Sequence, residues 1–489
     1  MTSLDPALDP ARTAPRPLLT VIALCFGGLT AALTQTMVIP IQSELPELLG
    51  TSGANAGWVV TATLLAAAVS MPVAGRLADL YGKQRVLVVN AALLIAGSVL
   101  SAVTSSLLPM LAGRTLQGFA MGFIPVGIAL MREFTPPHMT SSAIAAMSAT
   151  LGVGGAIGLP LSAWIADGHD WHLLFWVSAG LAVAMLLSTV FLVPHIHDAQ
   201  PGRLDVLGGV GLALGLVTFL VGVSKATTWG WGSGRTWAAI VGGLVVLLAW
   251  GAYELRQADP LVDLRTTARP QILLTNIAAI AIGFGMMAQS IVVPQLLEMP
   301  AATGYGLGQS ILAAGLWMAP AGLTMMLFAP VSSTLIDRAG AKQTLMLGAA
   351  VIGIGYVVAV AMMDAPWQLL VASCIAAAGV GIGYAAMPTL ILDSAPAREA
   401  ASAVGVNALM RSVGTTLSAA VMATILTSST TSLGGFALPT RGAFQVCFLI
   451  GAVAAFVGVA IAATIPRGRP RDAQELAAPA PVGAEAEAA

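Results

Sequence analysis

The sequence is poor in charged residues. Asp, Glu, Lys and Arg make up 9% of its 489 residues, whereas 57% are hydrophobic. Because a soluble chain needs many more charged side chains to cover its surface, this composition excludes an ordinary soluble domain. The apolar residues come in runs of about 20, the length of a membrane-spanning helix, without the alternation of barrel strands. The sequence therefore predicts an all-α polytopic membrane protein in a lipid bilayer.

Cysteine is also scarce, and its three positions lie inside apolar runs without the spacing of a zinc site or a disulfide framework. Neither a phosphate-loop motif nor a His-Glu-x-x-His motif occurs. These absences argue against an ATP-driven pump. They also disfavour a multispan membrane enzyme, which we keep as a remote alternative. We expect no catalytic residues, no bound metal or other cofactor, and no nucleic-acid partner.

Fourteen apolar spans are expected. They lie at 18–40, 55–75, 85–104, 107–131, 141–166, 171–193, 205–224, 236–255, 271–296, 308–333, 342–363, 367–391, 400–427 and 442–465.

The distribution of Lys and Arg supports this count, since both concentrate on the cytoplasmic side of membrane proteins. With the N-terminus placed inside, sixteen of the 21 fall on the inner side and three outside, while Arg114 and Arg411 lie within spans. Arginine strongly outnumbers lysine, and Ala, Gly and Val are abundant, which indicates a GC-rich bacterial genome. We therefore expect a multi-pass protein of the bacterial inner (plasma) membrane with both termini in the cytoplasm.

One short motif occurs twice. Pro72, Val73, Leu77, Asp79 and Gly82 recur without a gap as Pro330, Val331, Leu335, Asp337 and Gly340. The copies join the second span to the third and the tenth to the eleventh, which indicates two related bundles. We predict a disordered cytoplasmic N-terminus (1–17), a six-helix bundle (18–193), a two-helix insert with its linker (194–270), a second six-helix bundle (271–465) and a disordered cytoplasmic tail (466–489).

These motifs resemble those of the major facilitator superfamily, and the fourteen spans are similar to its drug:proton antiporter branch, which includes multidrug efflux pumps. The family pattern Gly-x-Leu-Ala-Asp-Arg-x-Gly-Arg-Lys is matched at Gly75, Leu77, Ala78, Asp79, Gly82 and Lys83 and differs at Leu80 and Gln84. Arg-x-x-Gln-Gly in the fourth span is matched by Arg114, Gln117 and Gly118. The exporter pattern of the fifth span is kept only in part, in Gly154–Ala163.

The resemblance implies a monomeric secondary active transporter that exports apolar or amphiphilic drugs or metabolites by alternating access. The proton gradient would be its energy source, with the substrate and protons as its partners. The alternative is a dedicated exporter of a native lipid or secondary metabolite, not necessarily proton-coupled. No Asp or Glu lies deep inside an expected span, and Thr34 stands near the place where this branch often carries a carboxylate.

The resemblance also implies roles for individual residues. Asp79 would form a latch between the bundles on the cytoplasmic side, or else only anchor the loop. The residues of this predicted latch are Gly75, Asp79, Gly82, Lys83 and Asp337.

Arg114, with Gln117 one turn away, would line the central cavity and influence proton movement, unless it snorkels to the outer surface. Arg411 would either join a cytoplasmic network or face the cavity. Possible substrate contacts are Thr34, Gln35, Gln289 and Trp317, although such polar groups often just bridge helices. Several methionines near Trp317 would suit an adaptable apolar pocket or simply pack: Met286, Met287, Met318, Met325 and Met326.

Overall fold

The computed structural model describes residues 17–39, 41–42, 44–166, 169–195, 202–433 and 436–466. The termini expected to be disordered, 1–17 and 466–489, lie outside these residues except for Pro17 and Pro466, and so does part of the expected linker, 196–201. Within the described residues, fourteen helices are long and apolar enough to cross a membrane, which is the number expected. The chain is therefore a multi-pass membrane protein.

The first bundle contains six spanning helices. They are α1 (Pro17–Thr36), α4 (Trp58–Tyr81), α5 (Lys83–Ala102), the broken helix α6 (Leu107–Phe119) with η1 (Ala120–Gly122) and α7 (Phe123–Phe134), α8 (Pro137–Ala166) and α9 (Leu173–Leu192). The second bundle repeats this order. Its helices are α13 (Pro270–Glu298), the broken helix α14 (Ile311–Leu327) with α15 (Ala329–Ala339), α16 (Ala341–Ala361), the broken helix α17 (Pro366–Gly383) with α18 (Ala386–Ser394), α19 (Ala400–Ser428) and α20 (Arg441–Thr464).

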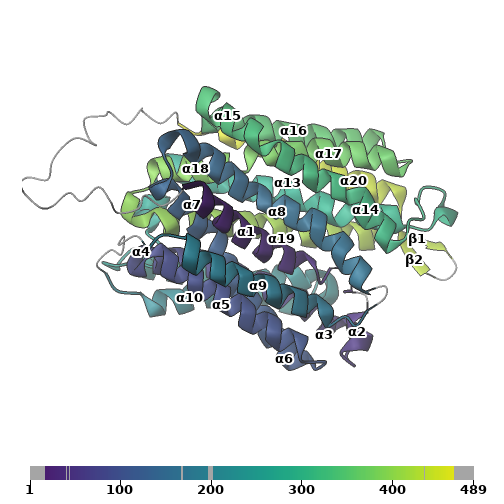
Figure 1. The fold of residues 1–489 in the computed structure, drawn as a ribbon. Helices are drawn as coiled ribbons and strands as arrows, with labels where there is room; N and C mark the ends of the chain where they lie inside the picture. The colour runs from purple at the N-terminus through teal and green to yellow at the C-terminus, as the bar shows by residue number, and fades with distance from the viewer. Residues whose placement is uncertain are drawn as a thin grey trace, which may run out of the picture.

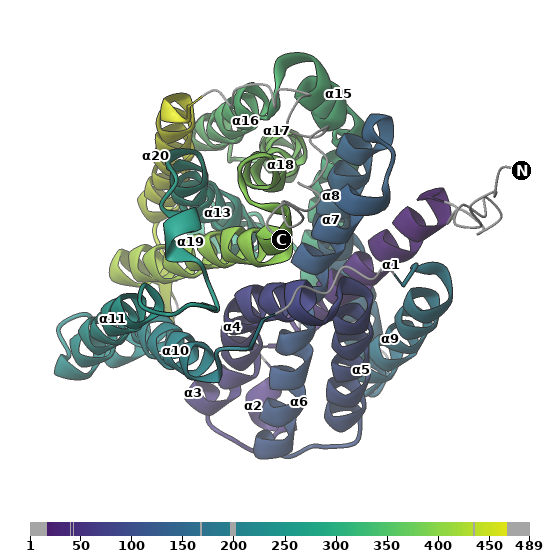
Figure 2. The ribbon, with the colours of Figure 1, turned by 90° about the vertical axis from the view of Figure 1, so that its left-hand side faces the viewer.

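Two further spanning helices, α10 (Val206–Trp229) and α11 (Gly234–Glu254), form the insert. They pack against each other, and α10 packs on α4 and α19, one helix from each bundle. Figure 2 shows α11 at the edge of the molecule, beyond α10. The two six-helix bundles and the pair of inserted helices have the expected arrangement (Figure 1).

Short elements complete the structure. They are α2 (Leu45–Leu48), α3 (Gly53–Ala56), α12 (Leu264–Thr267), η2 (Ala301–Thr303), η3 (Ala397–Glu399) and the antiparallel strands β1 (Thr430–Leu433) and β2 (Phe436–Pro439). The two-stranded hairpin between α19 and α20 was not expected from the sequence. Its end is held by Tyr305, whose hydroxyl donates a hydrogen bond to the carbonyl of Pro439.

The repeated motif is more helical than the expected spans imply. Asp79 lies in the last turn of α4 and Asp337 in the last turn of α15, so a single glycine makes each turn. Gly82 has φ +95° and Gly340 has φ +87°, in the left-handed region that residues with a Cβ rarely adopt. Each glycine therefore reverses the chain directly into the next helix, α5 or α16.

The bundles meet through equivalent pairs of helices. The second helix of the first bundle, α4, packs on α19, and the second helix of the second bundle, α14 with α15, packs on α8. Glycine permits the first of these contacts. A Cβ added at Gly75 would overlap the backbone of Ala401, and one added at Gly405 would overlap the backbone of Met71. Small residues at such crossings let helix backbones approach closely in membranes.

Candidate functional site

Both copies of the repeated motif lie at one end of the molecule. Lys83, after the first turn, places its Nζ 2.7 Å from Oε1 of Glu133 near the end of α7. Asp337, before the second turn, accepts a hydrogen bond of 2.6 Å from the hydroxyl of Ser141 near the start of α8. Since α7 ends and α8 begins within three residues, both turns are at the same end. We call this end the hairpin side, after the helical turns at Gly82 and Gly340 and not after the β1–β2 hairpin. Figure 2 views the molecule from the hairpin side.

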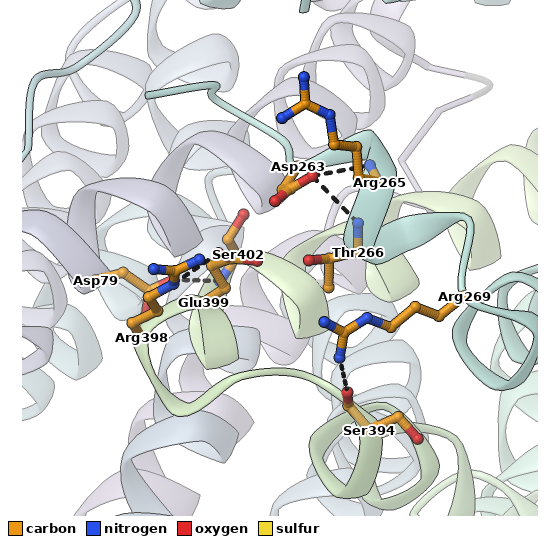
Figure 3. Close-up of polar contacts among 9 residues, drawn as sticks. All are labelled: Asp79, Asp263, Arg265, Thr266, Arg269, Ser394, Arg398, Glu399 and Ser402. Atoms are coloured by element: carbon orange, nitrogen blue, oxygen red, sulfur yellow. Dashed lines mark hydrogen bonds and ion pairs between the residues drawn. The ribbon is translucent and has the colours of Figure 1, made fainter. Parts of the chain in front are cut away.

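Asp79 joins the two bundles at the hairpin side. Its Oδ1 accepts a hydrogen bond from the backbone N–H of Ala401 at 3.1 Å, and its Oδ2 accepts one from Ser402 at 2.9 Å (Figure 3). These N–H groups belong to the first turn of α19, which has no intrahelical partners for them and carries the positive end of the helix dipole. Asp79 is only 2% exposed. The contact expected of the latch is therefore present, while its gating role stays a prediction.

Lys83 lies beside the carboxylate of Asp79. Its Nζ is 4.0 Å from Oδ1 of Asp79, and the Lys83 side chain is 3% exposed. Because the closer ion pair is with Glu133, Lys83 ties the start of α5 to the end of α7 within the first bundle. Its cation also offsets part of the buried negative charge of Asp79.

Asp337 makes the equivalent contact in the other direction. Asp79 joins the second helix of the first bundle to the fifth of the second, and Asp337 joins the second helix of the second bundle to the fifth of the first. The two contacts differ in strength. Asp337 is exposed and accepts from a side-chain hydroxyl, whereas Asp79 is buried and accepts from two backbone N–H groups.

A third contact between the bundles was not anticipated. Nη1 of Arg132, near the end of α7, lies 3.1 Å from Oδ1 of Asp393, near the end of α18. The two residues close the fourth helices of the two bundles, so this contact lies near the pseudo-symmetry axis. Arg132 and Asp393 lie just after the fourth and twelfth expected spans. Their equivalent positions in the two halves of the sequence could have predicted that they form a pair.

The linker from the insert runs beside these contacts. Asp263 caps α12 by accepting hydrogen bonds from the N–H groups of Arg265 and Thr266, at 2.8 and 3.1 Å (Figure 3). Nη1 of Arg269 donates to the carbonyl of Ser394 at 3.1 Å. The insert is thus attached to the second bundle next to the start of α19.

A cavity of about 240 Å³ lies between the bundles, away from the hairpin side. Gln289, in its wall, lies roughly 28 Å of helix rise beyond Pro270, where α13 starts at the hairpin side. The walls come from α1 and α8 of the first bundle and from α13, α14 and α17 of the second. The lining residues include Thr36, Gly152, Gly155, Met286, Gln289, Met318 and Met325.

Gln289 is the predicted substrate contact that the structure places in this wall. Its Nε2 donates to the carbonyl of Ser373 at 3.3 Å, and its backbone N–H donates to the hydroxyl of Tyr356 at 2.9 Å. Met286, Met318 and Met325 also line the cavity, while their use as an adaptable pocket stays a prediction. Met287 and Met326 are not among the lining residues.

Thr34, Gln35 and Trp317 are placed differently from the expectation. Thr34 is 2% exposed and its hydroxyl donates to the carbonyl of Thr30 at 2.9 Å. Trp317 turns its Nε1 toward Oε1 of Gln309 at 3.2 Å, and neither it nor Gln35 lines the cavity. Thr36 takes this place on α1, because each residue along a helix turns the side chain by about 100°.

Arg114 lies inside the first bundle, behind the cavity wall. It is 1% exposed, and its guanidinium donates to the carbonyl of Val59 at 3.2 Å and to Oε1 of Gln117 at 2.6 Å. Gln117 donates in turn to the hydroxyl of Ser98 at 2.9 Å. A weaker contact of 3.5 Å joins Nη1 to the carbonyl of Thr34. The side chain therefore neither lines the described cavity nor snorkels outward, and neutral oxygens hold the cation; its influence on proton movement stays a prediction.

Arg411 faces the other bundle instead. Its guanidinium carbon lies 4.2 Å from the centre of the Tyr384 ring, a cation–π contact, and Ile124 and Ile128 of α7 complete the surroundings. The space between them, about 10 Å³, has room for about one water molecule. Arg411 lies roughly 14 Å of helix rise beyond Ser402, so it stands at the bundle interface between the hairpin-side contacts and the cavity.

The described residues contain no group of three or more His, Cys, Asp or Glu side chains placed to hold a metal ion. The three cysteines are free thiols, with Cys25 and Cys374 half-buried and Cys447 buried. They make packing contacts inside helices, as the sequence suggested.

The sequence model of the Major Facilitator Superfamily matches residues 24–419 and 275–486. The chain belongs to the major facilitator superfamily. A structural comparison gives the same fold: a crystal structure of the human organic anion transporter MFSD10 superposes with a TM-score of 0.65 over 92% of this chain and 100% of that one, at 14% identity. This chain therefore has the major facilitator fold.

Bacterial relatives of this chain are described as transporters or as resistance and export proteins. An uncharacterized MFS-type transporter of Mycobacterium tuberculosis is 28% identical over 76% of this chain and 53% of its own, so the chain spans about half the length of that relative. A multidrug resistance protein B homolog of the same species is 26% identical over 84% and 76%. The tetracenomycin C resistance and export protein of Streptomyces glaucescens is 26% identical over 84% and 76%.

Proposed function

We propose that this major facilitator transporter exports apolar or amphiphilic drugs or metabolites from the cell by alternating access, in exchange for protons. The observation that carries the proposal is the cavity between the bundles. Its wall combines flexible methionines and small residues with few polar groups, chiefly Gln289 and Thr36. Such a surface can adapt to apolar compounds of different shape. The export and resistance functions named for two of its relatives support the direction of transport.

The contacts at the hairpin side fit one end state of an alternating-access cycle. Asp79 with the start of α19, Asp337 with Ser141, and Arg132 with Asp393 hold the bundles together at that end. The distribution of Lys and Arg supports a cytoplasmic location for the hairpin side. In this proposal the structure is closed toward the cytoplasm, and rocking of the bundles would break these contacts to open the cavity inward.

Proton exchange requires a carboxylate that changes its charge during the cycle. Asp79 is suited to this role because its charge strengthens the two hydrogen bonds that it accepts from α19. Protonation would weaken both bonds and favour opening at the hairpin side. Glu298, the last residue of α13 at the far end, is a second candidate for a proton site on the opposite face.

Reconstitution into proteoliposomes tests this proposal. A fluorescent amphiphilic cation would be followed with and without an imposed pH gradient, beside empty vesicles and vesicles that carry the Asp79→Asn variant. We expect uptake into inside-out vesicles that follows the pH gradient and is accompanied by proton release. Transport at the same rate without any gradient and without proton movement would show that the carrier is not an antiporter.

A dedicated exporter of one native lipid or secondary metabolite is the second candidate function. The similarity to an export protein for a single antibiotic, tetracenomycin C, favours it. A susceptibility panel of structurally unrelated drugs, in a host that lacks its own efflux pumps, separates the two. Resistance to several classes supports the multidrug transporter, whereas protection against one compound alone supports the dedicated exporter.

A further inference from the structure

A second cavity, of about 320 Å³, lies between the hairpin-side halves of α4 and α5. We call it the α4–α5 groove. Its walls are apolar and include Val73, Leu77, Val86, Val89, Leu93 and Phe119. Val89 is 55% exposed, and Tyr81, at the hairpin-side end of the groove, is 49% exposed. The groove therefore opens to the surface of the first bundle. In Figure 2, α6 lies between α4 and α5 on the side away from the second bundle. The lining residues belong to α4, α5 and α6 of the first bundle, and none of them lines the cavity between the bundles, so the groove is a separate site.

Two polar groups line the groove at different depths. Arg85, in the first turn of α5, is exposed and forms no ion pair with any residue that the structure describes. Asn90 lies deeper, is 4% exposed, and its Nδ2 is buried without a hydrogen-bond partner among the described residues. A buried amide group without a partner is rare, because its lost hydrogen bonds to water are not replaced. Asn90 therefore leaves an amide donor without a described partner in the wall of the groove.

The spacing of these two groups matches the polar part of a phospholipid. Arg85 and Asn90 are separated by roughly 7.5 Å of helix rise. The polar region of one leaflet is about 5–8 Å thick, since it accounts for the difference between the whole bilayer and its hydrocarbon core. A phosphate at Arg85 therefore places the ester carbonyls near Nδ2 of Asn90. One acyl chain would then continue along Val89 and Leu93.

The charges of the groove select among headgroups. Its lining contains the cation of Arg85 and no carboxylate. A zwitterionic headgroup would bring an ammonium group that has no acceptor in the lining, whereas an anionic headgroup would meet a cation that forms no ion pair with the described residues. We infer that the α4–α5 groove binds one anionic phospholipid from the leaflet on the hairpin side, with its phosphate at Arg85 and an ester carbonyl at Asn90. This inference does not depend on what the protein transports.

The test is the lipid that stays with the purified protein. The full chain would be expressed in membranes that contain both zwitterionic and anionic phospholipids, extracted in mild detergent, and analysed by native mass spectrometry. We expect about one retained anionic lipid per protein. Arg85→Gln should lower the ratio of anionic to zwitterionic lipid about fivefold, the difference that one basic residue makes near an anionic surface. Arg85→Lys should keep the selectivity, and Asn90→Leu should reduce retention of all lipids.

Arg256→Gln is the matched control, because Arg256 is exposed just after α11 and outside the groove. It should retain lipid as the wild type does. Equal lipid ratios in the Arg85→Gln and Arg256→Gln proteins would overturn the inference, and so would a wild-type protein that retains mainly zwitterionic lipid. If a transported amphiphile competes for the groove and displaces the retained lipid, the groove is a substrate entry path and the inference is wrong.

Discussion

The substitution Asp79→Asn measures how strongly one contact closes the hairpin side. Asparagine keeps the size of the side chain but loses its charge, and its amide offers one acceptor oxygen where Asp79 uses two. Either Ala401 or Ser402 then has its N–H facing an amide donor. A hydrogen bond to a charged group contributes about 1.5–3 kcal/mol to the closed state. Water hydrogen bonds to the same groups in the open state, which offsets part of this contribution. We expect the closed state to lose about 2 kcal/mol, roughly a thirtyfold change in the ratio of closed to open molecules.

Spin labels on both bundles report this shift directly. Tyr81 of the first bundle and Arg338 of the second are exposed at the hairpin side and can carry the labels, once Cys25, Cys374 and Cys447 have been replaced by alanine. Wild type should give mainly the short distance of the closed state, and Asp79→Asn should populate a longer one. Export should fall, because a transporter that stays open toward the cytoplasm completes fewer cycles.

Asp259→Asn is the matched control for this experiment, since Asp259 is an exposed carboxylate near the same end of the molecule. It should leave both the distances and the export of a fluorescent substrate unchanged. If Asp79→Asn reaches the membrane in normal amount, keeps the wild-type distance distribution and exports normally, the carboxylate does not act as a latch.

Substitutions at Arg114, at Gln289 and at the Arg132–Asp393 pair test the other residues of the site. Arg114→Ala should abolish transport. Arg114→Lys should not restore it, because the ammonium group cannot reproduce the separate bonds to Val59 and Gln117. Wild-type rates in vesicles with either variant would remove Arg114 from the mechanism. Gln289→Ala should change relative affinities among substrates while leaving proton-driven cycling intact, and an unchanged substrate profile would place this residue outside the binding surface. Arg132→Glu should reduce export only modestly, since an exposed ion pair contributes at most about 1 kcal/mol. The added change Asp393→Arg should restore export, because it forms the pair again with reversed charges. Failure of the double variant to recover would show that the pair does not act as one contact.

The sequence was sufficient for the architecture because the membrane restricts it so strongly. A span must be apolar and about 20 residues long, and each added or missing span would reverse the side of every later charge. The sequence also indicated a tight turn at each copy of the motif, because Gly82 and Gly340 recur at the same place in both halves. The helix ends were less accurate. Asp79 and Asp337 were expected in loops, yet polar residues can continue a helix beyond the apolar part of a span.

The site was harder to predict because neighbouring residues on a helix face different directions. Thr34 and Thr36 have the same chemistry, and the tilt and rotation of α1 decide that Thr36 lines the cavity. Hydropathy gives no information on rotation when a helix is apolar all round. Contacts between the bundles have the same difficulty, because Arg132 and Asp393 are far apart in the chain.

The two copies of the repeated motif are unequal, and this inequality explains why one aspartate carries most of the proposed closure. Position 75 is glycine, so α4 can approach the backbone of α19 closely enough for Asp79 to reach two N–H groups. The equivalent position on α15 is Ser333, whose side chain is buried and donates to the carbonyl of Pro330. Asp337 reaches only a side-chain hydroxyl of α8 and stays exposed, where water competes for its charge. In the proposed cycle, we therefore expect opening at the hairpin side to depend mainly on the Asp79 contact, and a proton delivered there to have a larger effect than one delivered at Asp337.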